Sequence, residues 1–177
     1  MAGTRGVGMT ISYRDATPGD GAALNRIFDT TFCDAFGHLY RPEDLDAFLT
    51  SFGVDDWEAQ LANPAHAVRI AETSDAPVGY VKLGPMKLPI ATDRPAILLE
   101  QLYVLKDYQG AGLARGLMDW ALAEARRRGA ADLYLTVFID NHRARRFYDR
   151  FGFEAVGRYD FMVGSHADED VIMRMAL

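Results

Sequence analysis

The stretch Gln109 to Ala114, with the sequence Gln-Gly-Ala-Gly-Leu-Ala, constrains the fold more than any other part of the chain. It follows an apolar run over residues 97–104 that predicts a β-strand, and it precedes a run to Arg128 with helical periodicity. Glycines at such a turn let the backbone approach a ligand closely, because they lack a Cβ. The first N–H groups of the helix and the positive end of its dipole then face that ligand. The stretch therefore predicts an anion site, with a tight turn of small residues as the alternative.

Two other phosphate-binding loops do not fit this stretch. A P-loop requires Lys and then Ser or Thr after its last glycine, whereas Leu113 and Ala114 follow Gly112. A dinucleotide-binding fold requires an acidic residue about 20 positions on, at the end of the next strand. Neither Glu124 nor Asp132 fits that position.

Composition limits the class of protein. The chain has 177 residues, of which 49% are hydrophobic and 25% charged, and this predicts one globular domain, over residues 10–177. The stretch Met1 to Gly8 is rich in glycine, so we expect a flexible tail over residues 1–9. The net charge of −6 argues against nucleic acid as a partner. The single cysteine, Cys33, excludes an intramolecular disulfide and a cysteine-rich metal site, and we expect no metal. No apolar run is long enough for a membrane span or a signal sequence, so we expect a cytoplasmic protein with no membrane partner.

Hydrophobic periodicity predicts alternating groups of strands and helices. We expect a strand at 10–14, helices starting at 22, 42 and 56, strands at 68–72, 78–83 and 97–104, a helix after the glycine stretch, a strand at 133–139, a helix from 142, and strands at 154–163 and 171–175.

Two acidic positions stand out in that pattern. Strict alternation over 97–104 places Glu100 on one face with Leu98, Leu102 and Val104, and a carboxylate in an apolar row is costly unless it is paired, hydrated or used. Residues 164–169 are predicted to be a polar connection. The acidic run from Asp168 to Asp170 is interpreted as a solvated hairpin, with attraction of a cationic substrate as the alternative.

A second motif follows at Asn141-x-x-Ala144-x-x-Phe147-Tyr148-x-x-x-Gly152-Phe153. With Gln109-x-x-Gly112-x-Ala114 before it, the chain resembles the GCN5-related N-acetyltransferases. A looser likeness to the PaiA-like diamine and polyamine N-acetyltransferases rests on residues 99–104, on the aromatic segment 32–40 before Pro42, and on the C-terminal residues 161–164 and 170–173.

The resemblance implies an α/β (α+β) fold. Its central sheet is mixed, mostly antiparallel and twisted, has about six to seven strands and is flanked by helices. Two parallel strands, holding Val104 and Val137, splay apart to form the acetyl-CoA cleft.

The resemblance also assigns roles to individual residues. Tyr148 matches the proton donor to the departing thiolate, and Glu100 matches the strand glutamate that serves as base in some relatives. The positions matched to cofactor binding are Leu102, Tyr103, Val104, Gln109, Gly110, Ala111, Gly112, Leu113, Ala114, Asn141, Ala144 and Tyr148. Asn141 could instead serve only as a helix cap, Tyr148 only as a core residue, and Glu100 only as a structural acid.

The function implied by the resemblance is transfer of an acetyl group from acetyl-CoA to a primary amine by direct attack, with a polyamine or another small amine as acceptor. An alkyl amine with a pKa of about 10.4, like that of lysine, is mostly protonated at neutral pH, so a base is needed. The alternatives are an N-terminal or lysine acetyltransferase acting on proteins, and a non-catalytic acyl-CoA-binding sensor. The sequence leaves the choice between monomer and homodimer open.

Overall fold

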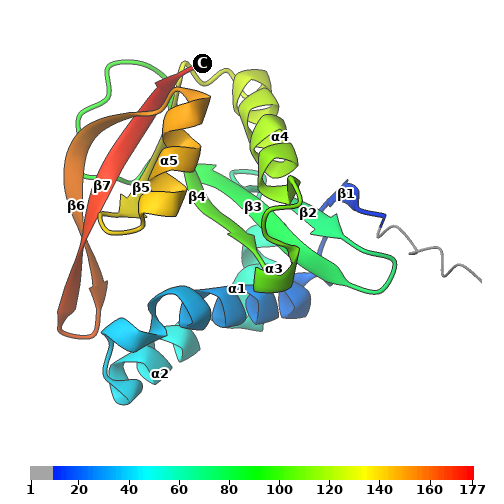
Figure 1. Ribbon diagram of the computed structural model, residues 1–177. Coiled ribbons are helices and arrows are strands. Elements are labelled where there is room, and N and C mark those ends of the chain that lie inside the picture. The colour runs from blue at the N-terminus through cyan, green and yellow to red at the C-terminus, as the bar shows by residue number, and fades with distance from the viewer. Residues whose placement is uncertain (1–9) are drawn as a thin grey trace, which may run out of the picture.

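The computed structural model describes residues 10–177, and the tail predicted over residues 1–9 lies outside this range. Seven strands form one sheet in the order β1-β2-β3-β4-β5-β7-β6 (Figure 1). The strands are β1 (Ser12–Asp15), β2 (Ala67–Glu72), β3 (Pro77–Pro85), β4 (Ala96–Val104), β5 (Asp132–Phe138), β6 (Glu154–Val163) and β7 (His166–Ala176). The helices are α1 (Gly21–Phe36), α2 (Pro42–Thr50), α3 (Val54–Leu61), α4 (Leu113–Arg127) and α5 (His142–Phe151), with short 3-10 turns η1 (Gly37–Leu39) and η2 (Lys106–Tyr108).

The central pair of strands separates along its length. β4 and β5 are parallel, and they pair only where residues 96–98 meet residues 132–134; every other neighbouring pair of strands is antiparallel. Beyond that point β4 and β5 diverge, which leaves a gap in the middle of the sheet (Figure 1). The mixed, mostly antiparallel sheet with a splayed parallel pair confirms the predicted fold.

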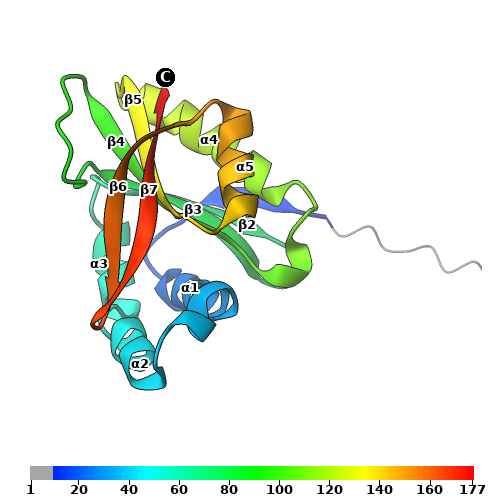
Figure 2. The same ribbon diagram turned by 60° about the vertical axis from the view of Figure 1, so that its left-hand side comes forward.

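Helices cover both faces of the sheet, as Figure 2 shows. On one face α4 buries Leu117, Met118 and Ala121 in the largest core cluster, and α5 adds Tyr148 to it. On the other face a separate cluster joins α1 and α3 to β2 and β3, with Trp57 of α3 completely buried in it. Burial of these apolar faces is the main force that holds the helices on the sheet.

A β-bulge in β4 changes which of its residues share a face. Leu83 of β3 is opposite Leu99, and Lys82 is opposite Gln101, so Glu100 is the extra residue on β4. Leu99 and Leu102 therefore both contact the core under α4, whereas Leu98 belongs to a cluster on the opposite face. The prediction that Leu98, Glu100 and Leu102 share one face is wrong, because strict alternation does not continue through a bulge.

The final strand is longer than predicted. β7 begins at His166 and pairs with β6 as far as the turn at residues 164 and 165. Since alternate side chains of a strand point to the same face, the extension turns Asp168 and Asp170 inward, where they are 5% and 8% exposed. The interpretation of this acidic run as a solvated hairpin is wrong for these two residues.

Candidate active site

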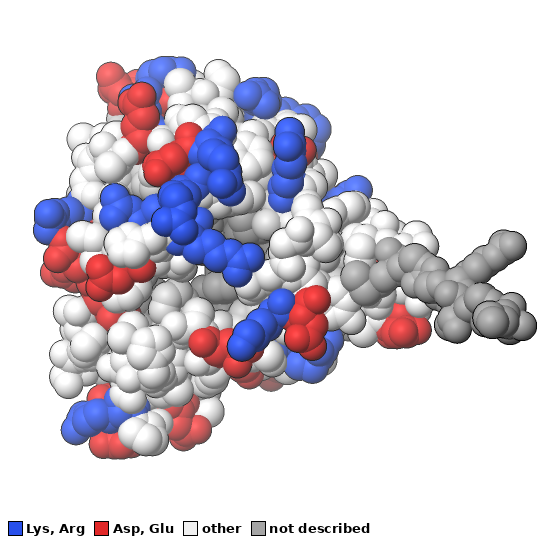
Figure 3. All heavy atoms as spheres, in the orientation of Figure 1, with Lys and Arg blue, Asp and Glu red and all other residues white. Residues whose placement is uncertain are grey.

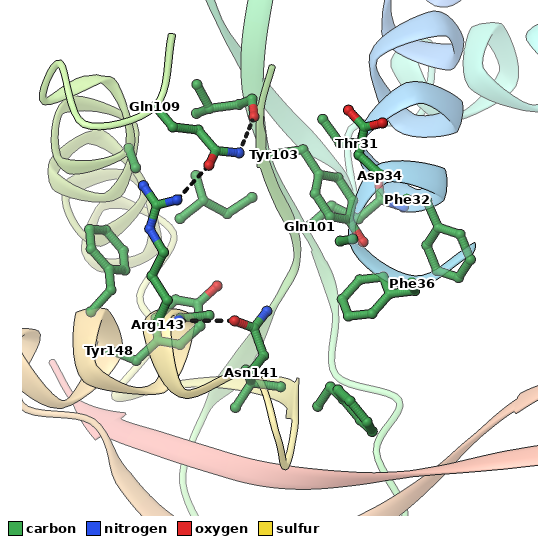
Figure 4. Close-up of a pocket in the computed structure, with 18 of the residues that line it drawn as sticks. Thr31, Phe32, Asp34, Phe36, Gln101, Tyr103, Gln109, Asn141, Arg143 and Tyr148 are labelled. Carbon is green, nitrogen blue, oxygen red and sulfur yellow. Dashed lines mark hydrogen bonds between the residues drawn. The ribbon is translucent and has the colours of Figure 1, made fainter. Parts of the chain in front are cut away.

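A cavity of about 690 Å³ lies at the gap between β4 and β5. Figure 4 shows residues from several elements around it, with Gln109, Arg143 and Tyr148 on one side and Phe32, Phe36 and Tyr103 on the other. The cavity has two chemically different ends, which we call the glycine-loop end and the acid end. The glycine-loop end is formed by Lys106, Gln109, Gly110, Gly112, Arg115 and Arg143, and the acid end by Phe32, Asp34, Phe36, Tyr40, Phe161, Asp168 and Asp170.

At the glycine-loop end the backbone is held open toward the cavity. Gly110 and Gly112 have φ angles of +84° and +83°, a conformation that favours glycine. A Cβ added at either position would meet no atom within 4 Å, so there is free space in front of both residues. Gly112 is the N-cap of α4 and has no side chain to satisfy the first N–H groups of that helix. An anion placed there would meet these N–H groups and the positive end of the dipole.

Gln109 connects the loop to its surroundings. Its Nε2 donates to the carbonyl oxygen of Val104 at 2.9 Å, and its Oε1 accepts from Arg143 Nη1 at 2.6 Å. Arg143 comes from the first turn of α5 and is exposed, so its guanidinium stays accessible at the mouth of the cavity. Lysine and arginine side chains gather over α5 beside the hollow in the surface (Figure 3).

Two predicted site residues, Asn141 at the N-cap of α5 and Tyr148 within α5, have a structural role and also line the cavity. Asn141 Oδ1 accepts from the backbone N–H of Ala144 at 3.2 Å, so Asn141 caps α5 and also lines the cavity. Tyr148 is 8% exposed and its ring packs against Phe147 and Phe153. Burial raises the pKa of the Tyr148 hydroxyl above its ordinary value, which keeps the hydroxyl protonated and able to donate.

Glu100 is engaged in ion pairs. Its carboxylate accepts from Lys82 Nζ at 3.0 Å and from Lys87 Nζ at 2.6 Å, and its side chain is only 6% exposed. Lys82 is itself buried and lies over the ring of Trp57, with Nζ 4.9 Å from the ring centroid. Burial alone would raise the pKa of Glu100, but the two lysines outweigh it and the pKa is lowered. The role of Glu100 as the base stays a prediction, and these ion pairs make it a weaker proton acceptor.

At the acid end two aspartates of β7 face the cavity. The Tyr40 hydroxyl donates to Asp168 Oδ2, and His166 Nε2 is 3.0 Å from Asp168 Oδ1. The carboxylate of Asp170 has neither a lysine nor an arginine within ion-pair distance among residues 10–177. Burial raises the pKa of Asp170 to about 6; the neighbouring charge of Asp168 adds to the rise, and the Thr136 hydroxyl opposes it.

The structure brings nearly all of the predicted site residues to this one cavity. Those that line it are Glu100, Leu102, Tyr103, Val104, Gln109, Gly110, Gly112, Ala114, Asn141, Ala144 and Tyr148. Ala111 is exposed and outside the lining, and the side chain of Leu113 is buried in the core, so each has only its backbone to offer a ligand at the loop.

Sequence reasoning missed the basic residues of the glycine-loop end, and it gave Asp168 and Asp170 a role in attracting a cationic substrate only as an alternative. Lys106, Arg115 and Arg143 are single basic residues near the two motifs, and their proximity to the glycine loop was the available signal. The pair Asp168 and Asp170 follows an i, i+2 spacing in line with Ile172, which indicates one face of a strand.

Among residues 10–177, no group of three or more His, Cys, Asp or Glu side chains is placed to hold a metal ion. No helix in that part of the chain has the length and hydropathy needed to cross a bilayer.

Comparisons with known proteins agree on one family. Residues 26–153 match the model of the acetyltransferase (GNAT) family. An uncharacterized N-acetyltransferase of Mycobacterium tuberculosis is 32% identical over 155 residues, which cover 87% of this chain and 96% of the relative. An uncharacterized N-acetyltransferase of Lactobacillus delbrueckii subsp. lactis is 27% identical over 149 residues, or 83% of this chain and 86% of the relative.

Solved structures share the fold. The PaiA N-acetyltransferase of Thermoplasma acidophilum, solved in complex with coenzyme A, matches with a TM-score of 0.77 and 18% identity over 96% of this chain and 100% of the other. The yncA protein of Salmonella typhimurium, solved with its cofactor acetyl-CoA, has a TM-score of 0.69 and 22% identity over 95% of this chain and 94% of the other.

Proposed function

Because this chain belongs to the acetyltransferase (GNAT) family, we propose that it transfers an acetyl group from acetyl-CoA to a small primary amine. The observation that carries this proposal is the single cavity that joins a glycine loop with basic neighbours to a buried tyrosine and a buried acid end. The glycine-loop end suits an anionic cofactor, and the acid end suits a cationic acceptor.

The chemistry of the glycine-loop end fits the diphosphate of acetyl-CoA. Gly110 and Gly112 leave open space in front of the backbone, and the first N–H groups of α4 have no capping side chain from Gly112. Arg143 and Arg115 would add positive charge next to these N–H groups. Acetyl-CoA has only acceptor groups on its phosphates, so this donor set matches it.

The gap between β4 and β5 fits the extended arm of the cofactor. Beyond Leu98 the edge of β4 that faces β5 has no strand partner, and the Val104 carbonyl is bonded by Gln109. The free backbone groups near Leu102 and Tyr103 would bond the amide groups of the arm, and an N–H near Val104 would stabilise negative charge on the acetyl oxygen.

Tyr148 is assigned the protonation of the thiolate that leaves when the amine displaces it. Acetyl-CoA supplies the reactive thioester, and a nearby phenol can donate its proton to the sulfur as negative charge builds up there while the C–S bond breaks. The raised pKa of Tyr148 means that the donor starts in the protonated state. Direct attack by the amine needs no covalent enzyme intermediate.

The experiment that tests the proposal is thiol release from acetyl-CoA near pH 8. The acceptor panel contains spermidine, spermine, putrescine, an aminoglycoside and a short peptide with a free N-terminus. We expect release above the amine-free blank with a small amine, and mass spectrometry should show one acetyl group on its nitrogen. Release only with the peptide would move the assignment to a protein acetyltransferase. Binding of acetyl-CoA without release for any amine would instead support a sensor.

A further inference from the structure

The two aspartates of the acid end differ in what they contact. Asp168 is held on both oxygens, one by the Tyr40 hydroxyl and one by His166. Asp170 is more than nine-tenths buried and lines the cavity, yet it has no cationic partner among residues 10–177. A buried carboxylate of this kind is costly unless a ligand supplies the missing charge.

Four basic residues, Lys106, Arg115, Arg143 and Arg150, line the same cavity, but among residues 10–177 no lysine or arginine is within ion-pair distance of Asp170. On its own strand it has Asp168, and in register it is opposite Tyr159 on β6 and Phe138 on β5. Tyr103 of β4 lines the same cavity; burial raises the pKa of its hydroxyl, and the charges of Tyr148 and Asp170 add to the rise. From α1 and the segment after η1, Asp34 and Tyr40 line the same cavity. Apart from His166, which is held by Asp168, the titratable groups near Asp170 are acids and phenols, and these favour a cation between them.

The walls around this carboxylate are aromatic. Phe32 packs on Phe36, with ring centroids 5.3 Å apart, and on Phe161, at 6.3 Å. Such faces attract an ammonium group and accommodate an alkyl chain. They also limit the access of water, which strengthens the interaction of the ammonium group with a carboxylate.

We propose that Asp170 binds the ammonium group of the acceptor and takes its proton, so that the acid end selects cationic primary amines. This inference rests on the proposed acetyl transfer. It moves the role of base from the paired Glu100 on β4 to an unpaired carboxylate on β7.

The proton and the electron pairs balance in this scheme. An N–H bond of the ammonium breaks and its proton goes to a carboxylate oxygen of Asp170. The freed lone pair forms the C–N bond to the acetyl carbon as the C–S bond breaks, and the sulfur takes the Tyr148 proton. The nitrogen, which is positively charged after the attack, loses a second proton to solvent and becomes a neutral amide. Asp170 returns its proton to solvent, and Tyr148 regains one from solvent.

The test compares wild type, Asp170→Asn and Asp170→Glu in pH profiles of kcat/KM for each panel amine that supports thiol release. We expect the wild-type activity to rise through pH 6, because only the deprotonated Asp170 can accept a proton. Asp170→Asn should lose about 100-fold or more in kcat/KM and lose the rise near pH 6, since general acid–base groups contribute about that factor. Asp170→Glu should retain the rise, because it retains a carboxylate.

The matched control is Asp160→Asn, which removes the same charge from an exposed position on β6. It should leave kcat/KM unchanged, and all variants should bind acetyl-CoA with the wild-type affinity. An Asp170→Asn enzyme that keeps the rise near pH 6, or that loses activity equally at every pH, would overturn the assignment. A wild type that releases no thiol with any amine would overturn the proposed function and this inference with it.

Discussion

The two ends of the cavity are built in opposite ways. The glycine-loop end comes from two short stretches, residues 106–115 and 141–143, and it presents backbone N–H groups and exposed arginines. The acid end is assembled from α1, the segment after η1, β6 and β7, so that Tyr40 bonds to Asp168 across 128 positions of sequence. The glycine-loop end is contained in local sequence motifs, whereas the residues of the acid end come together only after the chain has folded.

The two ends of the cavity therefore tolerate different substitutions. An anion site made of backbone groups depends on φ angles and on the start of α4, and it tolerates changes of side chain. A site made of buried side chains depends on each of them, because one substitution removes the charge or the wall. We therefore expect the glycine-loop end to define the class of reaction and the acid end to define the acceptor.

The largest effect is expected from Glu100→Gln, which tests whether Glu100 acts as a base or only stabilises the fold. Removal of its charge leaves Lys82 buried without a counter-ion, which should cost about 3–5 kcal/mol of unfolding free energy in urea at pH 7. The folded-state pKa of Glu100 is lowered, so its stabilising contribution is present above the ordinary value of 4.5 and is lost as the pH falls. The difference in unfolding free energy between Glu100→Gln and wild type should therefore become smaller at acidic pH.

Lys87→Met is the control for Glu100→Gln, because it removes the partner that is 67% exposed and should cost about 1 kcal/mol or less. If Glu100→Gln were as stable as wild type and lost about 100-fold in kcat, the scaffold role would be wrong and the base role supported.

Tyr148→Phe acts at a buried residue that lines the cavity and belongs to neither end. It removes the hydroxyl but keeps the ring, so kcat should fall by about 100-fold while the Kd of acetyl-CoA changes little. Tyr134→Phe is the matched control, because Tyr134 is also buried and lies outside the lining of the cavity. An unchanged kcat would show that Tyr148 is only a core residue.

Gly112→Val should affect the glycine-loop end alone. A β-branched side chain resists the φ of +83° and fills the space in front of the loop, so the affinity for acetyl-CoA should fall by more than tenfold, which is about 1.4 kcal/mol. Gly129→Val is the control. Gly129 has a φ of +79° and equally open space at the other end of α4, so it carries the same strain without a ligand. Equal losses of affinity by calorimetry would contradict the assignment of the loop.

Arg143→Gln should have the smallest effect. One exposed cation contributes about 1 kcal/mol to binding of a phosphate, so the affinity for acetyl-CoA should fall about fivefold and depend less on salt. Arg146→Gln on the same helix is the control, because Arg146 is exposed and outside the cavity lining. If Arg146→Gln lowered the affinity for acetyl-CoA as much as Arg143→Gln, only the overall positive charge of α5 would matter.

The sequence predicted the fold and the glycine-loop end because both depend on local patterns. Gly112 and Ala114 follow a strand signal and precede a helix signal, and the stripe through Ala144 and Tyr148 has clear helical spacing. Each of these features is contained within about one turn or one strand of the chain.

The rest could not be read from local patterns. No glycine or proline marks the bulge at Glu100, so strict alternation assigned its neighbours to the wrong faces. The acidic run from Asp168 to Asp170 has the composition of a surface turn, and only pairing with β6 and β5 turns two of its residues inward. The acid end depends on pairings over long distances, which a single sequence does not show.

The unpaired burial of Asp170 also has a consequence for the stability of the whole protein. Its pKa is raised from 3.8 to about 6 on folding, so the folded chain holds this proton more tightly than the unfolded chain does. Folding stability therefore falls as the pH rises from 3.8 to 6, by up to about 3 kcal/mol from this one group. At pH values where the Asp170 carboxylate is charged, the wild-type protein without ligand should be less stable than the Asp170→Asn variant. A bound ammonium would restore that stability, so a cationic acceptor should raise the melting temperature most at neutral pH.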